Sequence, residues 1–472
     1  MRFTLRSTVL ALALLSATAA HAAPPAAWLT TPDQKSLLAS VAVQAPQTGA
    51  AVIELKTNEQ YQRMVGFGAA ITEASAWVLN HRMAPEQRKQ VLREMFTREN
   101  GGLGFEFTRL TIGASDFSRE HYSLDDMPPG GADMALEHFS IAPEEADVLP
   151  VTREALKLNP QLKVMASPWS APGWMKSGDS LIQGTLRDDR QEVFARYLVR
   201  YAEEAKRLGV PLFALTLQNE PHFEPGDYPG MRLRPRQRAE VIKLLGPMLE
   251  QRGLPVQILE WDHNWDEAYS PLSTLSDEGA RRYIAGVAWH CYGGDPSVQS
   301  RVSRQYPKLD VWLTECSGGM WEPDWNKRLP WAVQNLVIGA TRNGARGVLM
   351  WNLVLDDKYG PHKGGCNDCY GIVNLNADGS LMRSVEYYAF GHVSRFVVQG
   401  ARRIGSETRG TAAGLEHVAF QNPDGSVVLV VGNQGKEAQA FSVRGTGRSS
   451  SSFTLPAGSI VTLRYSKGHS KG

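Results

Sequence analysis

The sequence predicts an α/β protein, a (β/α)8 TIM barrel with a side β-sandwich domain formed by both chain ends. Two observations predict this fold. Short apolar runs alternate with amphipathic helix patterns between residues 63 and 396, and such alternation is typical of right-handed βαβ units. Segments of alternating polarity, separated by turns, occur within residues 23–62 and 397–472. Eight βαβ units fit a closed barrel, and a doubly wound open sheet is the structural alternative.

Each predicted barrel strand is a near-continuous apolar run, as expected for parallel strands buried on both faces. One helix, predicted over Gln191–Leu208, has a single apolar stripe and is followed by Gly209 as a stop signal. The eight predicted strands are Gly66–Ile71, Phe105–Gly113, Leu162–Trp169, Leu212–Gln218, Val256–Trp261, Gly286–Tyr292, Val311–Thr314 and Val348–Leu353.

The flanking segments have the pattern of hairpins. The turn sequence Asn422-Pro423-Asp424-Gly425 separates two alternating runs, because Pro, Asp and Gly each favour a tight turn. The predicted strands of this second domain are Val52–Leu55, Glu416–Gln421, Ser426–Val431, Phe453–Leu455 and Ile460–Tyr465.

The composition excludes some partners. The chain has 472 residues, and its 50 Lys and Arg balance 49 Asp and Glu, which argues against nucleic acid or a strongly anionic polymer as the main partner. Twelve Trp residues serve core packing for the most part, although flat indole rings also suit the apolar faces of sugars. The eleven His include no HExxH pair, so we expect no metal and no cofactor.

The first 22 residues have the features of a cleavable signal peptide. Arg2 and Arg6 precede a short apolar run, Val9–Leu15, and Ala20-His21-Ala22 provides a small-x-small cleavage site. We therefore expect a secreted or periplasmic protein. No other segment approaches about 20 apolar residues, so we expect no stable membrane insertion.

The four cysteines do not form a disulfide scaffold. Cys366 and Cys369 lie in a Gly-rich loop, where a local disulfide fits an oxidising compartment better than a zinc site that has no second ligand pair. The pairing of Cys291 and Cys316 stays open.

Two carboxylates mark the candidate active site. In a barrel, functional residues cluster at the carboxyl ends of the strands, and the fourth and seventh runs end in Asn219-Glu220-Pro221 and Thr314-Glu315. A retaining glycosidase needs two such groups about 5–5.5 Å apart. One strand-end Glu alone would more simply be a rim salt bridge, but two such residues, Glu220 and Glu315, favour catalysis.

The motifs resemble those of glycoside hydrolase family 30, in the clan of (β/α)8 retaining glycosidases, with the glucosylceramidase-like branch most similar. Besides the two glutamate motifs, the stretches that carry the resemblance are Gly66–Glu73, Ser115-Asp116-Phe117-Ser118, Ser167–Pro172 and Trp351-Asn352-Leu353. The resemblance spans nearly the whole mature chain.

The resemblance implies Glu220 as acid/base and Glu315 as nucleophile, and it implies roles for further residues. Asn219 would bind the sugar 2-hydroxyl, Tyr292 would touch the nucleophile, and Arg109 would support it, although Arg109 could also be a purely structural ion partner. The remaining substrate-binding positions that match are Asp116, Trp169, His290 and Trp351, of which Trp351 could instead belong to the barrel core. We expect Glu220 to have a raised pKa and Glu315 a low one, as acid and nucleophile require.

The substrate is less defined by the sequence. We expect a β-linked glycoside or glycan as substrate, with a glycolipid among the candidates, and release of β-glucosyl units by a glucosylceramidase-like enzyme of sphingolipid metabolism. An endo-β-1,6-glucanase or a β-xylosidase or β-fucosidase is the alternative, and an inactive carbohydrate-binding barrel is the alternative outside enzymes. Trp321 and Trp325 lie after the seventh strand, either buried on the barrel or forming an apolar lip at the site.

Overall fold

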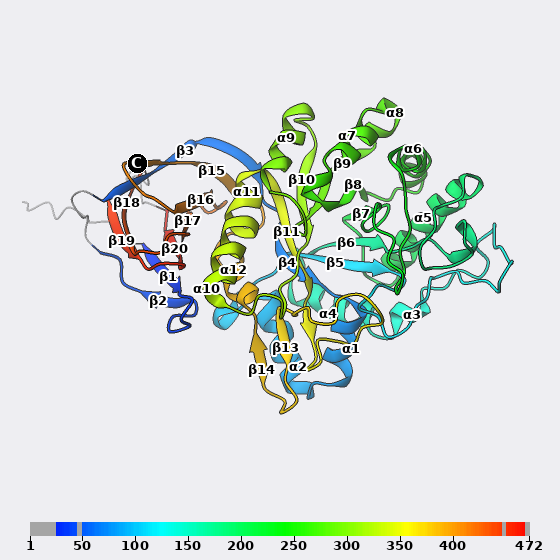
Figure 1. Ribbon diagram of the computed structural model, residues 1–472, viewed down its shortest axis with the longest axis horizontal. Helices are drawn as coiled ribbons and strands as arrows, with labels where there is room; N and C mark the ends of the chain where they lie inside the picture. The colour runs from blue at the N-terminus through cyan, green and yellow to red at the C-terminus, as the bar shows by residue number, and fades with distance from the viewer. Residues whose placement is uncertain (1–24, 45–49, 446–449, 468–472) are drawn as a thin grey trace, which may run out of the picture.

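The computed structural model describes residues 25–44, 50–445 and 450–467, and eight of their strands close into a parallel barrel (Figure 1). The barrel order excludes the open-sheet alternative. The strands, in chain order, are β4 (Gly66–Ala70), β5 (Phe107–Ile112), β6 (Lys163–Pro168), β7 (Ala214–Thr216), β8 (Gln257–Asn264), β9 (Ile284–His290), β10 (Asp310–Glu315) and β11 (Ala345–Asn352), with β11 pairing β4. All eight overlap the predicted runs.

Side chains from near the amino-terminal ends of the strands fill the barrel interior. Phe107 and Trp312 meet there with ring centroids 5.3 Å apart. Gly347 leaves room for them, because a Cβ atom at this position would lie 2.7 Å from the Phe107 ring. The interior is therefore a packed core and not a pore, which leaves function to the upper rim.

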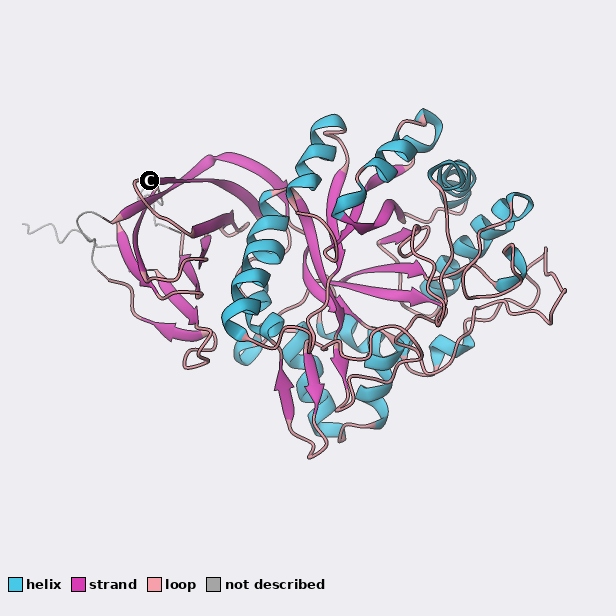
Figure 2. Ribbon diagram, viewed as in Figure 1, coloured by secondary structure: helices cyan, strands magenta, loops and turns pink. Residues whose placement is uncertain are grey.

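Helices cover the outside of the barrel, as Figure 2 shows. The predicted helix is present as α5 and ends at Arg207, where Gly209 follows in the left-handed region with φ +84°. The helices are α1 (Glu73–His81), α2 (Pro85–Phe96), α3 (Ala142–Glu145), α4 (Val148–Leu158), α5 (Gln191–Arg207), α6 (Pro235–Gln251), α7 (Tyr269–Leu275), α8 (Glu278–Arg281), α9 (Ser297–Gln305), α10 (Trp325–Ala332), a π-helical segment (Val333–Gly339), α11 (Ala340–Arg342) and α12 (Val385–Ser394).

Both ends of the chain form the second domain, as predicted. It is one nine-stranded sheet in the order β19-β18-β3-β15-β16-β17-β20-β1-β2, which curls beside the barrel (Figure 1). A bridge between Gln44 and Ser452 brings its two edges together around an apolar core. Its strands are β1 (Ala26–Thr30), β2 (Ala39–Val41), β3 (Ala51–Arg63), β15 (Arg402–Arg409), β16 (Leu415–Gln421), β17 (Val427–Asn433), β18 (Gln439–Arg444), β19 (Ser451–Leu455) and β20 (Ile460–Tyr465).

A third, small sheet was not predicted. It contains β12 (Val354–Leu355), β13 (Val373–Leu375) and β14 (Leu381–Arg383), and it follows the last barrel strand. The loop between β12 and β13 carries the cysteine pair and lies at the barrel mouth.

Both cysteine pairs form disulfides. The predicted Cys366–Cys369 bond is present, and Cys291 pairs with Cys316, which joins the residues that follow β9 and β10. The predicted signal peptide, residues 1–22, lies outside the described residues. Among the helices of the described ranges, none combines the length and the apolar character needed to cross a bilayer.

Candidate active site

The two predicted glutamates meet at the carboxyl end of the barrel. Glu315 is the last residue of β10, and Glu220 follows β7 with φ +48°. One carboxylate oxygen of Glu220 lies within 4.8 Å of one of Glu315. This spacing fits the pair of a retaining glycosidase and is too short for the 6.5–9.5 Å that an inverting enzyme leaves for a water molecule.

The Glu315 carboxylate is held by two side chains. Arg109, from β5 and fully buried, donates from Nη1 to Oε2, and Tyr292 donates from its hydroxyl to Oε1 at 2.9 Å. The second Arg109 nitrogen, Nη2, donates to the amide oxygen of Asn219 at 2.8 Å. Arg109 therefore touches both the Glu315 carboxylate and the residue beside Glu220, and is not only a structural ion partner.

The Glu220 carboxylate faces two histidines. Nδ1 of the fully buried His290 lies 3.0 Å from Glu220 Oε1, and Nε2 of His263 lies 3.7 Å from the same oxygen. His290 Nδ1 is also 3.9 Å from Glu315 Oε1. The predicted His290 thus lies between the two carboxylates, while His263 was not predicted.

One buried carboxylate of the site escaped the sequence analysis. Asp262, on β8, is fully buried and accepts hydrogen bonds from Arg109 Nη2 at 2.8 Å and from His290 Nε2 at 3.0 Å. It lies at an irregularity of β8, where Trp261 and Asp262 have φ +83° and +65°. The signal was present in the sequence, because Asp262 is the polar residue that follows the fifth apolar run.

The pKa directions of the two glutamates are opposite to the expectation. Burial raises the pKa of Glu220, but the hydrogen bond from His290 and the nearby positive charges outweigh burial and lower it overall. Burial raises the pKa of Glu315 against the charges of His290 and Arg109, and the Glu220 charge adds to this rise. Burial lowers the pKa of His290, but the Glu315 charge and the hydrogen bonds to Asp262 and Glu220 outweigh burial and raise this pKa to about 9. The protonated His290 ring then lowers the pKa of Glu220, which reverses the expected order of the two glutamates.

Aromatic rings form one wall of the site. Trp169 and Trp351 stack with centroids 4.9 Å apart and an interplanar angle of 18°, and the Arg109 guanidinium lies 4.8 Å from the Trp169 ring centroid. Trp351 is only 3% exposed yet lines the cavity, so it serves both the core and the site. Asp116 lines the same cavity, and its pKa is raised by burial and by the charges of the two glutamates.

The catalytic cavity opens toward a second one. The cavity around Glu220 and Glu315 has a volume of about 600 Å³, and its neighbour has about 380 Å³. They share Tyr292, Ser317 and Trp321. The Trp321 ring is half exposed, so it stands between the two cavities and is not buried in the barrel.

Glu220, His290 and Glu315 also have the donor atoms of a cation site, since one atom from each lies within 4.8 Å of the others. Each donor already has a hydrogen-bond partner in the protein: Arg109 and Tyr292 for Glu315, and Asp262 and Glu220 for His290. The two glutamates are therefore arranged as an acid and base pair, supported by the Arg109 guanidinium and the His290 ring.

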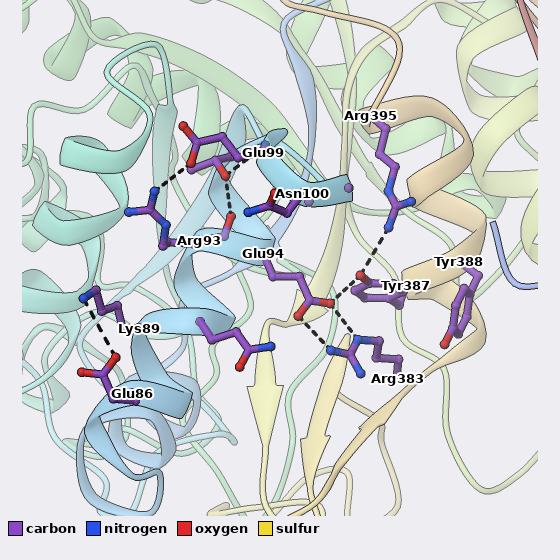
Figure 3. A pocket seen from close by; sticks show the side chains of 14 residues that line it. Glu86, Lys89, Arg93, Glu94, Glu99, Asn100, Arg383, Tyr387, Tyr388 and Arg395 are labelled. Atoms are coloured by element: carbon purple, nitrogen blue, oxygen red, sulfur yellow. Dashed lines mark hydrogen bonds and ion pairs between the residues drawn. The ribbon is translucent and has the colours of Figure 1, made fainter. Parts of the chain in front are cut away.

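Another cavity, of about 770 Å³, lies away from the glutamates. Figure 3 shows that polar and charged side chains from α2, β14, α12 and the residues next to them line this cavity, and that several of them are paired with one another. Glu94 accepts two hydrogen bonds from Arg383 and one from Tyr387. We interpret this cavity as a polar joint between elements.

Sequence comparisons decide the family. Residues 64–397 match the glycosyl hydrolase family 30 TIM-barrel domain, and residues 400–463 match the β-sandwich domain of the same family. The chain belongs to glycosyl hydrolase family 30. It is therefore an O-glycosyl hydrolase, and the family that its motifs resemble is confirmed.

Among its relatives, the endo-1,6-β-D-glucanase neg1 of Aspergillus fumigatus is 33% identical over 399 residues, which cover 79% of this chain and 78% of the relative. A putative glucosylceramidase of Caenorhabditis elegans is 30% identical over 432 residues, covering 87% and 82% of the two chains. The solved structure of the endo-β1,6-glucanase BT3312 matches with a TM-score of 0.87 and 32% identity, over 94% of this chain and 99% of that one.

These relatives shift the balance within the family. The predicted glucosylceramidase-like branch is represented, but the endo-1,6-β-glucanases match at higher identity. The alternative drawn from the sequence is therefore better supported than the main interpretation.

Proposed function

We propose that this family 30 hydrolase is an endo-1,6-β-glucanase that cleaves β-1,6-linked glucan with retention, with Glu315 as nucleophile and Glu220 as acid/base. The observation that carries the mechanism is the approach of the two carboxylates to within 4.8 Å. The similarity to endo-1,6-β-glucanases over four fifths of the chain and more supports the substrate.

The reaction has two steps. Glu315 attacks the anomeric carbon while Glu220 donates a proton to the leaving oxygen, which gives a glycosyl-enzyme. Glu220, now ionised, then takes a proton from a water molecule as that water attacks the same carbon. Arg109 and Tyr292, which hold Glu315 through both oxygens, orient the nucleophile and stabilise its charge when it departs.

Four residues suit the first sugar. Trp351 and Asp116 line the catalytic cavity, and Trp169 stacks on Trp351. Asn219 lies directly before Glu220 and bonds to Arg109. The amide oxygen of Asn219 is occupied by Arg109 at 2.8 Å, so its amide nitrogen is the group left to bind a sugar hydroxyl beside Glu315.

The second cavity favours a glycan over a lipid as the leaving group. Trp321 and Trp331 line it, and so do the charged side chains of Glu322, Lys327 and Arg328. Lys327 pairs with Glu322 at 3.4 Å and Arg328 pairs with Glu386 at 2.5 Å, and an acyl chain in this cavity would remove these ion pairs from water, which costs free energy. A sugar ring can stack on an indole and bond to the charged groups with its hydroxyls.

Two kinds of experiment test the proposal. Assays on β-1,6-glucan, β-1,3-glucan, glucosylceramide and aryl β-xylosides should give the largest kcat/KM on β-1,6-glucan, with oligosaccharides as early products. A larger value for glucosylceramide would return the assignment to the other branch.

Variants of the glutamates test the roles. Glu315→Gln should abolish turnover while the protein stays folded, and Glu220→Ala should lose activity on poor leaving groups yet form β-glycosyl azide when azide is added. A wild-type rate in either variant would end the assignment of that residue.

We also propose that the enzyme is exported. The features of residues 1–22 support this location, and a polymeric glucan outside the cell would be within its reach. The mass of the protein purified from a secreting host is the measurement that locates the cleavage site.

A further inference from the structure

Asp262 contacts both halves of the catalytic machinery. Its side chain bonds to Arg109, which holds Glu315, and to His290, which faces Glu220. We propose that Asp262 is the common positioning residue of the two catalytic glutamates, and that it fixes His290 in the form that exchanges a proton with Glu220. The inference rests on the proposed roles of Glu220 and Glu315.

The two oxygens of Asp262 have separate tasks. Oδ2 accepts from Arg109 Nη2 at 2.8 Å, from Ser167 at 2.8 Å and from Thr216 at 2.7 Å. Oδ1 lies 3.0 Å from His290 Nε2 and accepts from the Thr314 hydroxyl at 2.6 Å. Every one of these partners is fully buried, so only a carboxylate, which accepts on both oxygens, satisfies them all.

The backbone adds a third link to the acid/base residue. The carbonyl oxygen of Asp262 accepts the backbone N–H of Glu220 at 3.0 Å. Asp262 and Trp261 both adopt positive φ, a conformation that non-glycine residues hold only when their surroundings enforce it. Here the irregularity of β8 turns both the carbonyl and the carboxylate of Asp262 toward the neighbouring strands.

This geometry defines the path of one proton. Because Asp262 accepts from Nε2–H, the exchangeable proton of His290 is the one on Nδ1, 3.0 Å from Glu220. That proton passes to Glu220 and leaves neutral His290 with its Nε2–H in place, and Glu220 then gives it to the leaving oxygen. In the second step, the proton that Glu220 takes from water returns to Nδ1, which restores the starting state.

The same path explains the reversed pKa directions. The hydrogen bond from protonated His290 lowers the pKa of Glu220 in the free site, so the acid proton rests on the ring beside it. As Glu315 bonds to the sugar it loses the charge that raises the pKa of His290, so the ring gives up this proton more readily during the first step.

The test is Asp262→Asn. The amide nitrogen cannot face Arg109, because two donors would meet, so it faces His290 and forces Nε2 to accept. The proton then stays on Nδ1, directed at Glu220, which keeps Glu220 ionised. We expect kcat/KM on β-1,6-glucan to fall about 10³-fold or more, as a wrong histidine tautomer does in a serine protease triad.

The leaving group separates positioning from simple structural damage. β-Glucosyl fluoride needs little protonation, so Asp262→Asn should reduce kcat/KM on it only about tenfold, through Arg109. Thr216→Val is the matched control, since it removes one hydrogen bond to the same carboxylate and keeps the charge. It should change both substrates by the same factor. Equal losses on both substrates in Asp262→Asn would overturn the proposal.

A measurement on the unmodified enzyme covers the case in which Asp262→Asn does not fold. In protein labelled with ¹⁵N-histidine, NMR should find the Nε2 proton of His290 retained from pH 5 to 9, with Glu315→Gln altering the titration of Nδ1 alone. A ring protonated only at Nδ1 would overturn the inference. An active Glu315→Gln or Glu220→Ala variant would instead overturn the proposed function.

Discussion

The spacing of the two glutamate side chains has a consequence for stereochemistry. With carboxylate oxygens within 4.8 Å, no water fits between Glu315 and the sugar, so the product should form by two inversions at the anomeric carbon. Proton NMR in the first minutes of hydrolysis should therefore detect the β-anomer before mutarotation. An α-anomer appearing first would contradict the proposed pair.

The Trp321 side chain links the catalytic cavity to its neighbour. It is 50% exposed and touches no reacting atom, so its contribution should be to the binding of a remote sugar ring. Trp321→Ala should raise KM on β-1,6-glucan about tenfold, with little change on aryl glucosides that never reach it. Steady-state kinetics on both substrates is the measurement.

A matched control lies four residues further on, at the first residue of α10. Trp325 packs against Tyr388 with ring centroids 5.6 Å apart and belongs to the edge of the barrel core. Trp325→Ala should lower the melting temperature and leave the ratio of the two KM values unchanged. If Trp321→Ala behaves in the same way, Trp321 is a packing residue and the leaving-group surface lies elsewhere.

At the residue scale, the sequence predicts the site residues that a strand-end pattern or a family motif marks. Glu220 and Glu315 were predicted because polar residues that end apolar strands are conspicuous, and the contacts of Arg109 and Tyr292 followed from the family resemblance. Asp262 was not found. The fifth predicted strand ends at Trp261, one residue before Asp262. No sequence pattern indicates that Trp261 and Asp262 adopt positive φ and turn the Asp262 carboxylate into the barrel.

At the element scale, Glu94 joins three elements outside the barrel. It projects from α2 and accepts bonds from Arg383 of β14 at 2.7 and 2.8 Å and from Tyr387 of α12 (Figure 3). Burial raises the pKa of Glu94, but the bonds from Arg383 and Tyr387 outweigh burial and lower it overall. The ionised form is therefore the one that holds these elements together.

Glu94→Gln should destabilise the fold in a pH-dependent way. A lowered folded-state pKa contributes stability above the unfolded value, near 4.5, and this contribution is lost as the pH falls through the folded value. We expect a loss of about 1–2 kcal/mol at pH 7 that shrinks as the pH falls below 4.5. Melting temperatures of both proteins across this range are the measurement.

Glu86→Gln on the same helix is the control, because the Glu86 side chain is 90% exposed and lies 4.0 Å from Lys89. An exposed pair of this kind contributes less than about 0.5 kcal/mol at any pH. A pH-independent loss in Glu94→Gln would mean that shape and not charge matters at this joint.

The elements that the sequence predicted well are those with strong local patterns. Eight buried runs and the stripe of α5 mark their positions without help from the rest of the chain. Boundaries were weaker: β7 has only three residues, Ala214–Thr216, although its apolar run is longer, because pairing with β6 and β8 decides where a strand ends. The sheet of β12, β13 and β14 depends on long-range pairing and leaves no periodic signal.

At the scale of the whole molecule, His392 connects the barrel to both ends of the chain. This residue of α12 is fully buried, and its ring nitrogens each lie 2.9 Å from a hydroxyl, Nδ1 from Thr462 of β20 and Nε2 from Thr30 of β1. The Thr462 hydroxyl donates to the His392 carbonyl at 2.7 Å, so it accepts from Nδ1–H, and burial keeps the ring neutral. The neutral His392 ring thus links the curled sheet to the barrel through hydrogen bonds to β1 and β20.

This joint predicts how the enzyme loses stability in acid. Burial lowers the pKa of His392 to about 3, against 6.5 for an ordinary histidine. Between these values the unfolded chain takes up a proton that the folded chain refuses, so the stability contribution falls as the pH drops below 6.5. From pH 8 to pH 5 the loss from this residue should be about 2 kcal/mol.

His392→Gln removes the titration but keeps a donor and an acceptor in the gap between Thr30 and Thr462. It should be less stable than the wild type at pH 8, by about 1–3 kcal/mol for imperfect hydrogen bonds. As the pH falls to 5 the wild type alone carries the histidine penalty, so the difference should narrow by about 2 kcal/mol. Urea unfolding of both proteins at the two pH values measures this directly, and a constant difference would show that His392 does not govern the acid sensitivity of the junction.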